Sequence, residues 1–101
     1  MTDNSFTVTV ARDLEDLIPG FMQNRRSEVE ALRTALTSSD FEKLHQLGHR
    51  MKGVGNSYGF ARITTVGIQI EEAARSRDQT SLDELISGYA EYLDKVTVEY
   101  E

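Results

Sequence analysis

His49 is the residue of this sequence best suited to chemistry with another molecule. It lies in the run Gly48-His49-Arg50-Met51-Lys52-Gly53, so a lysine follows about one helical turn later and a glycine stands beside that lysine. An unperturbed imidazole titrates near pH 6.5, so its neutral form is an available nitrogen nucleophile near pH 7. Attack on an acyl phosphate would leave a phosphoramidate on His49, and the positive charge of Lys52 would offset the arriving phosphoryl oxygens.

The rest of the sequence is chemically sparse. Phosphoryl transfer mainly needs in-line positioning and charge neutralisation, so a carrier can be simple if its partner holds the metal. The sequence contains no glycine-rich phosphate loop, no evident acidic metal cage around His49 and no sign of an ATP-binding kinase domain. The sequence is sparse in the way that suits a carrier with no intrinsic cofactor.

The helix predicted around His49 turns this histidine toward solvent. Its apolar stripe steps by three and four residues through Phe41, Leu44, Gly48, Met51, Gly55 and Tyr58. His49 follows Gly48 by one residue and so points about 100° away from that stripe. A second, outward row carries His45, His49, Lys52, Gly53 and Asn56. The spacing predicts an exposed imidazole.

Three glycines in this helix call for an explanation, because each costs on the order of 1 kcal/mol relative to alanine in a helix interior. Gly48 and Gly55 fall on the inward stripe, where a missing side chain lets two helices approach closely. Gly53 falls on the outward row, where packing offers no reason for it. We interpret Gly53 as the clearance that a phosphoryl group and an incoming protein need beside His49.

The N-terminal part of the chain is predicted to be a lead-in followed by a helix. Residues 1–10 are interpreted as a flexible or extended lead-in, because the strand-prone run Thr7–Val10 has too few partners for a sheet. Pro19 either starts a helix or kinks a longer one. Helical apolar spacing begins after the lead-in, with Arg25 as its one polar interruption, and includes Leu14, Leu17, Ile18, Phe21, Val29, Leu32 and Leu36.

Three further helices are predicted from the same periodicity. Ser39 and Glu42 have the spacing of a capping box at the start of the helix that carries His49, and residues 56–59 indicate its end and a turn. A third helix ends near residues 75–78, and the last is predicted to extend through Tyr100. Residues 11–101 are therefore expected to form one all-α, up-down-up-down four-helix bundle.

Composition limits the classes of function. The chain has 101 residues, 39% of them hydrophobic, which suits one small domain, and its lack of cysteine excludes disulfides and thiolate metal sites. A net charge of −6 with only small basic groups disfavours nucleic-acid binding. No stretch resembles a membrane span or a secretion signal, so we expect a cytoplasmic monomer with no membrane partner. Met1 and the polar start favour a free-standing protein.

The sequence resembles the histidine phosphotransfer (HPt) domains of two-component phosphorelays from about residue 11 to residue 100. The family signature is a small residue, His, two further residues, Lys and Gly, with another glycine about ten residues after the histidine; here these are Gly48, His49, Lys52, Gly53 and Gly59. The resemblance implies a four-helix bundle with His49 as phosphoacceptor, Lys52 supporting the phosphorylated state and Gly53 permitting close docking. Met51 stands where leucine or isoleucine is common.

The resemblance also implies a phosphocarrier that is not itself an enzyme, and partners from which it receives its phosphoryl group. They would be the receiver domains of response regulators, which contribute a phosphorylated aspartate and Mg²⁺, and a hybrid or sensor histidine kinase. We expect His45, Gln46, Arg50 and Asn56 to lie at the docking rim, although ordinary solvated positions explain these residues equally well.

Two other functions remain open on the sequence. Glu42, His45 and His49 could hold a metal, since Glu42-x-x-His45 matches half of a di-iron motif of helical bundles, although Glu71-Glu72 is an incomplete complement to it. Alternatively, the chain could dock receivers without carrying phosphate, because acceptor and docking surface would coincide.

Overall fold

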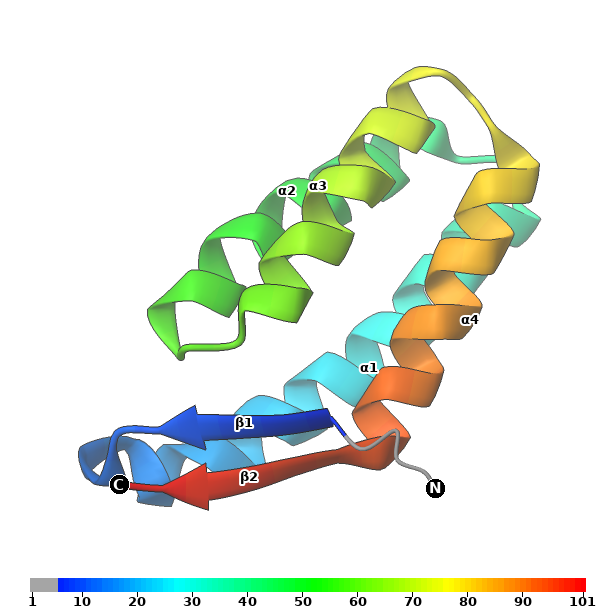
Figure 1. The fold of residues 1–101 in the computed structure, drawn as a ribbon. Coiled ribbons are helices and arrows are strands. Elements are labelled where there is room, and N and C mark those ends of the chain that lie inside the picture. The colour runs from blue at the N-terminus through cyan, green and yellow to red at the C-terminus, as the bar shows by residue number, and fades with distance from the viewer. Residues whose placement is uncertain (1–5) are drawn as a thin grey trace.

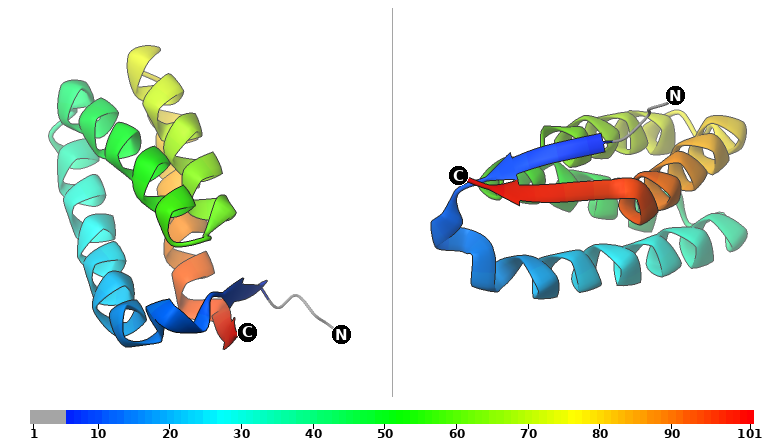
Figure 2. Two further views of the ribbon diagram at one scale, coloured as in Figure 1. Left: turned by 90° about the vertical axis from the view of Figure 1, so that its left-hand side faces the viewer. Right: turned by 60° about the horizontal axis from the view of Figure 1, so that its bottom comes forward.

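The predicted helices are present in the structure, a computed structural model in which residues 6–101 are described (Figure 1). They are α1 (Ile18–Thr37), α2 (Phe41–Ser57), α3 (Ala61–Arg75) and α4 (Gln79–Lys95), and a short 3-10 helix, η1 (Arg12–Leu17), precedes α1. Consecutive helices run in opposite directions, and α4 packs back against α1 (Figure 2). The predicted all-α four-helix bundle is confirmed. Among the described residues, no helix is long and apolar enough to cross a membrane.

The core lies where the apolar stripes of the helices meet. Fully buried residues come from all of the predicted stripes, and they include Leu32, Leu44, Met51, Phe60, Ile63, Ile70, Leu82, Ile86 and Tyr89. Leu17 was predicted to share the inward stripe of the first helix, and this prediction is wrong, since Leu17 is 53% exposed. It belongs to η1, whose tighter turn takes it off the stripe that α1 buries.

Arg25 does not interrupt the core but belongs to a buried polar cluster. Its Nε lies 3.2 Å from Oε1 of Glu28, an ion pair without the angle of a hydrogen bond, and its guanidinium carbon lies 4.9 Å from the centre of the Phe21 ring. The hydroxyl of Tyr89 donates to Glu28 at 2.9 Å. Burial raises the pKa of Glu28, and the charge of Arg25 and the hydrogen bond from Tyr89 offset part of that rise.

The helix termini are formed by local side-chain chemistry. Pro19 lies in the first turn of α1, so it starts that helix rather than kinking a longer one. Asp40, not Ser39, is the N-cap of α2, where its carboxylate accepts from the backbone N–H of Lys43 at 3.0 Å. The predicted capping box is therefore wrong, because Ser39 adopts a left-handed φ of 53° in the preceding turn. The predicted stop after α2 is confirmed, and Gly59 turns the chain there with a φ of +83°.

Residues 6–10 form a strand, so the interpretation that this segment has too few partners for a sheet is wrong. Strand β1 (Phe6–Val10) pairs in parallel with β2 (Val96–Tyr100), with Phe6 opposite Val96 and Val10 opposite Tyr100. The last helix consequently ends at Lys95 instead of continuing through Tyr100. Both strands lie side by side below the α2–α3 turn in Figure 1. Residues 1–5 of the predicted lead-in lie outside the described residues.

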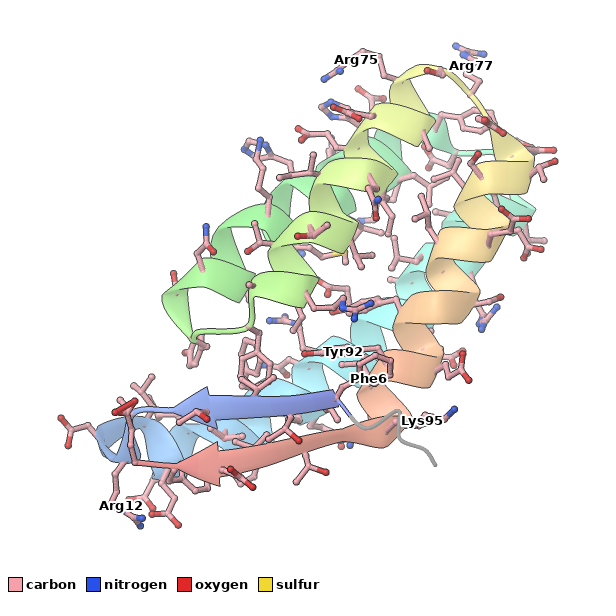
Figure 3. All side chains as sticks on the ribbon, viewed as in Figure 1. Phe6, Arg12, Arg75, Arg77, Tyr92 and Lys95 are labelled. Atoms are coloured by element: carbon pink, nitrogen blue, oxygen red, sulfur yellow. The ribbon has the colours of Figure 1, made fainter. Side chains whose placement is uncertain are left out.

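The small sheet is tied to the bundle by specific contacts. The ring of Phe6 meets that of Tyr92 on α4 edge to face, with 5.3 Å between the centroids (Figure 3). Val10, at the other end of β1, is only 2% exposed. Arg12 then donates to the backbone oxygens of Tyr100 at 3.3 Å and Glu101 at 3.2 Å. This pairing joins residues 6–10 and 96–101 across one end of the bundle (Figure 2).

Candidate functional site

His49 lies midway along α2 and faces solvent. Its side chain is 67% exposed, which confirms the predicted exposure of the imidazole. One turn later, a Cβ added to Gly53 would meet nothing within 4 Å. The surface beside His49 is therefore open at the position where the sequence predicts clearance.

Helices α2 and α3 approach each other closely below this surface. A Cβ added to Gly48 would lie 2.8 Å from the backbone oxygen of Gly67, and one added to Gly67 would lie 2.7 Å from the backbone oxygen of Gly48. A Cβ on Gly55 would meet the hydroxyl of Thr64 in the same way, at 2.5 Å. The prediction that Gly48 and Gly55 permit close helix packing is confirmed, and Gly67 is the matching position on α3.

This close packing brings a carboxylate from α3 to His49. Oε2 of Glu71 lies 3.1 Å from Nδ1 of His49, and Oε1 of Glu71 accepts from Nζ of Lys52 at 3.2 Å. The side chain of Glu71 is only 11% exposed, whereas that of Lys52 is 40% exposed. The carboxylate of Glu71 on α3 thus contacts both the imidazole of His49 and the ammonium of Lys52 on α2.

Glu71 is ionised at neutral pH. Desolvation acts to raise its pKa, but the hydrogen bonds and positive charges of Lys52 and His49 outweigh it, so the pKa of Glu71 lies below its ordinary value of 4.5. An ionised carboxylate only accepts hydrogen bonds. Nδ1 of His49 must therefore carry the hydrogen of this contact, which leaves the lone pair of the neutral ring on Nε2.

Glu71 was not predicted for this site from the sequence, in which it was named only as part of an incomplete metal complement. A signal for its role was nevertheless present. Glu71 follows Gly67 by four residues and so lies on the buried side of α3, next to Ile70. A carboxylate on a buried stripe needs partners, and the nearby cations and histidines of α2 were candidates for them.

The four residues predicted to lie at the docking rim differ in their surroundings. Gln46, Arg50 and Asn56 are exposed on α2. His45 is different, because it joins the cluster. Its side chain is 40% exposed, its Nε2 lies 3.6 Å from Oε2 of Glu71, and Nη2 of Arg75 approaches the same nitrogen at 3.4 Å. Arg75 lies at the end of α3 (Figure 3) and was not predicted for the site.

The cluster differs from the metal site that the sequence left open. The carboxylate shared by the two histidines is Glu71 rather than Glu42, and Lys52 already occupies its second oxygen. Within residues 6–101, no group of three or more histidine, aspartate or glutamate side chains is arranged to hold a metal ion. A cation between the two histidines would also have to lie beside Lys52 and Arg75, which repel it.

The comparison with known proteins agrees with this geometry at the level of the family. No curated protein and no solved structure matches the chain. The sequence does match the family of Hpt domains over residues 16–97, a range that includes all four helices and the whole cluster around His49. This chain belongs to the Hpt domain family.

Proposed function

We propose that His49 accepts a phosphoryl group from the aspartyl phosphate of one receiver domain and passes it to the aspartate of another. The Hpt family serves histidine phosphotransfer in phosphorelays, as a phosphocarrier rather than an enzyme. The observation that carries the proposal is the pairing of an exposed imidazole with a carboxylate beneath it. Glu71 occupies Nδ1 of His49, and Nε2 of this 67% exposed side chain is left available to an arriving protein.

In the forward step, the lone pair of Nε2 attacks the phosphorus of the aspartyl phosphate. The bond between phosphorus and the aspartyl oxygen breaks, and the aspartate leaves as a carboxylate. The ring now carries phosphorus on Nε2 and hydrogen on Nδ1, so it gains a positive charge. Glu71 lies 3.1 Å from Nδ1 and stabilises that charge as it develops. The reverse step returns the phosphoryl group to a second aspartate by the same path.

Lys52 offsets the negative charge of the phosphoryl oxygens. Its ammonium is 40% exposed and already lies beside His49, because Glu71 holds it at 3.2 Å. An ammonium has three hydrogens to donate, so Lys52 can keep its bond to Glu71 and still meet a phosphoryl oxygen. Because its bond to Glu71 keeps the ammonium of Lys52 beside His49, we expect Lys52 to contribute more to phosphoryl transfer than to partner docking.

The partner surface would surround His49 on α2. Gly53 leaves room for close approach, and the exposed side chains of Gln46, Arg50 and Asn56 are available to a receiver or kinase domain. We expect the receiver to contribute the reactive aspartate together with Mg²⁺. The positive charges of Arg50 and Lys52 would then face the acidic phosphorylation site of the partner.

The test is transfer from a purified receiver domain that has been phosphorylated with acetyl phosphate and Mg²⁺. We expect an acid-labile mass increase of one phosphoryl group on this chain, absent in His49→Gln and retained in His45→Gln. Circular dichroism and a receiver-binding measurement establish that His49→Gln is folded and still docks. A wild-type chain that binds receivers but never gains phosphate would instead support a docking module without phosphotransfer.

A further inference from the structure

Thr64 links α3 to the backbone of α2 by a hydrogen bond between the two helices. Its hydroxyl donates to the backbone oxygen of Lys52 at 2.9 Å, and its side chain is half-buried. Gly55 on α2 leaves the space that this hydroxyl occupies, because a Cβ added to Gly55 would lie 2.5 Å from it. The hydroxyl of Thr64 is therefore held against the part of α2 that carries Lys52.

Thr64 belongs to the stripe of α3 that faces α2. It precedes Gly67 by three residues and Glu71 by seven, so the three residues lie on one side of α3. Thr64 contacts the backbone oxygen of Lys52, and a Cβ added to Gly67 would lie 2.7 Å from the backbone nitrogen of Lys52. Glu71 then reaches the side chains of Lys52 and His49. One stripe thus carries both the bond to the backbone of α2 and the carboxylate that contacts His49.

The glycines and Thr64 constrain the two helices in different ways. Close packing of Gly48 against Gly67 sets how near the helices lie, but dispersion contacts between small residues have no preferred direction. A hydrogen bond weakens steeply away from its preferred distance and angle. The bond from Thr64 therefore sets where α3 lies along α2. Glu71 is seven residues further along a rigid helix, about 10 Å away, so its position follows that of Thr64.

We propose that Thr64 is a positioning residue, whose hydroxyl sets the register of α3 on α2 so that Glu71 meets Nδ1 of His49. The effect on His49 concerns the unphosphorylated chain, whereas its consequence for transfer rests on the proposed phosphotransfer function. Without the hydroxyl, Glu71 forms its hydrogen bond to Nδ1 less often, and the ring carries its hydrogen on Nε2 more often. A ring with hydrogen on Nε2 has no lone pair on the nitrogen that attacks.

The hydroxyl of Thr64 can be removed with little effect on folding. A carbonyl oxygen has two lone pairs, so the oxygen of Lys52 keeps its partner within the helix when the bond from Thr64 is lost. Alanine also suits a helix better than threonine does. We therefore expect Thr64→Ala to be folded, and circular dichroism checks this. Thr64→Val, which keeps the methyl group, repeats the comparison if the alanine variant folds poorly.

The experiment is nitrogen-15 NMR of the isolated chain with labelled histidine, at an alkaline pH at which the imidazoles are neutral. We expect the ratio of His49 rings with hydrogen on Nδ1 to those with hydrogen on Nε2 to fall about threefold or more in Thr64→Ala, because one hydrogen bond is weakened. Thr64→Ser differs from the alanine variant only by the hydroxyl and should keep the wild-type ratio. Thr65→Ala, the same change at the next and exposed position, is the control.

The same variants then separate phosphoryl transfer from docking. Single-turnover transfer from a saturating phosphorylated receiver should be about threefold or more slower in Thr64→Ala, in proportion to the tautomer ratio, with receiver affinity unchanged and the rate restored in Thr64→Ser.

Two outcomes distinguish the failure of each proposal. A wild-type tautomer ratio in both Thr64→Ala and Thr64→Val, or an equal fall in Thr64→Ser, would overturn the role of Thr64 even if the wild-type chain accepts phosphate. If the ratio changes as expected but the wild-type chain never accepts phosphate, the phosphotransfer function fails while the positioning of Glu71 by Thr64 stands.

Discussion

Oε2 of Glu71 on α3 lies 3.1 Å from Nδ1 of His49 on α2, although the two residues are 22 positions apart in the chain. This contact determines which ring nitrogen is free. It depends on the close approach of the two helices, which the facing glycines Gly48 and Gly67 permit. The contact between Glu71 and His49 therefore depends on the two glycines that let α2 and α3 pack closely.

Replacing Glu71 by glutamine should slow phosphoryl acceptance about tenfold or more. The amide can donate as well as accept, so it no longer specifies hydrogen on Nδ1 of His49, and it cannot stabilise the positive ring that forms during attack. Single-turnover transfer from a phosphorylated receiver measures the change. Glu72→Gln, at the neighbouring exposed position, is the matched control. Equal rates in both variants would rule out an orienting role for Glu71.

The same carboxylate should make stability depend on pH. Because the pKa of Glu71 in the folded state is below its ordinary value of 4.5, its ionised form stabilises the fold above that value, and this stabilisation is lost as the pH falls through the folded-state pKa. Urea unfolding should show wild type more stable than Glu71→Gln at neutral pH, with a smaller difference near pH 3. A difference that stays constant between these pH values would contradict the ion-pair account.

The buried cluster around Glu28 should be sensitive to loss of a single hydroxyl. Tyr89→Phe removes the hydrogen bond to Glu28 at 2.9 Å and leaves a buried carboxylate with Arg25 alone. We expect the free energy of unfolding to fall by about 1–2 kcal/mol. Denaturant unfolding measures this loss, and Tyr100→Phe on the half-buried end of β2 serves as the control. A Tyr89→Phe variant as stable as wild type would mean that the hydroxyl contributes nothing.

Two glycines of α2 should respond to substitution in opposite ways. Gly53→Leu adds a side chain in open space, so the fold should be unharmed or up to about 1 kcal/mol more stable, while transfer and receiver binding weaken. Gly48→Ala places a Cβ 2.8 Å from the backbone of α3 and should lower stability by about 1–3 kcal/mol. Thermal unfolding and receiver titration separate the two effects. Unchanged receiver affinity in Gly53→Leu would contradict the clearance argument.

The sequence predicted those parts of the molecule that depend on local spacing. The stripe from Phe41 to Tyr58 identified both the buried side of α2 and the outward direction of His49, because helical periodicity relates residues three and four apart. The same reasoning failed for β1, whose partner β2 lies about 90 residues later, beyond the reach of any local pattern. The prediction of Ser39 as the N-cap of α2 failed because the next residue, Asp40, takes that position and its carboxylate accepts from the backbone N–H of Lys43.

The candidate site was likewise predicted only on one helix. His49, Lys52 and Gly53 share α2, so their spacing alone placed them together, although their roles in transfer stay a prediction. Glu71 and Arg75 come from α3, and their contacts depend on the depth at which α3 packs against Gly48. The distance between α2 and α3 depends on the residues of both helices, so the periodicity of one helix alone does not predict it.

We propose that Glu71 holds Nδ1 of His49 and leaves Nε2 to take the phosphoryl group. Nitrogen-15 and phosphorus-31 NMR of the phosphorylated chain, with labelled histidine, tests it most directly. We predict phosphorus bonded to Nε2 of His49, with hydrogen retained on Nδ1 and His45 unmodified. Phosphorus on Nδ1 of His49, or on either nitrogen of His45, would contradict the account.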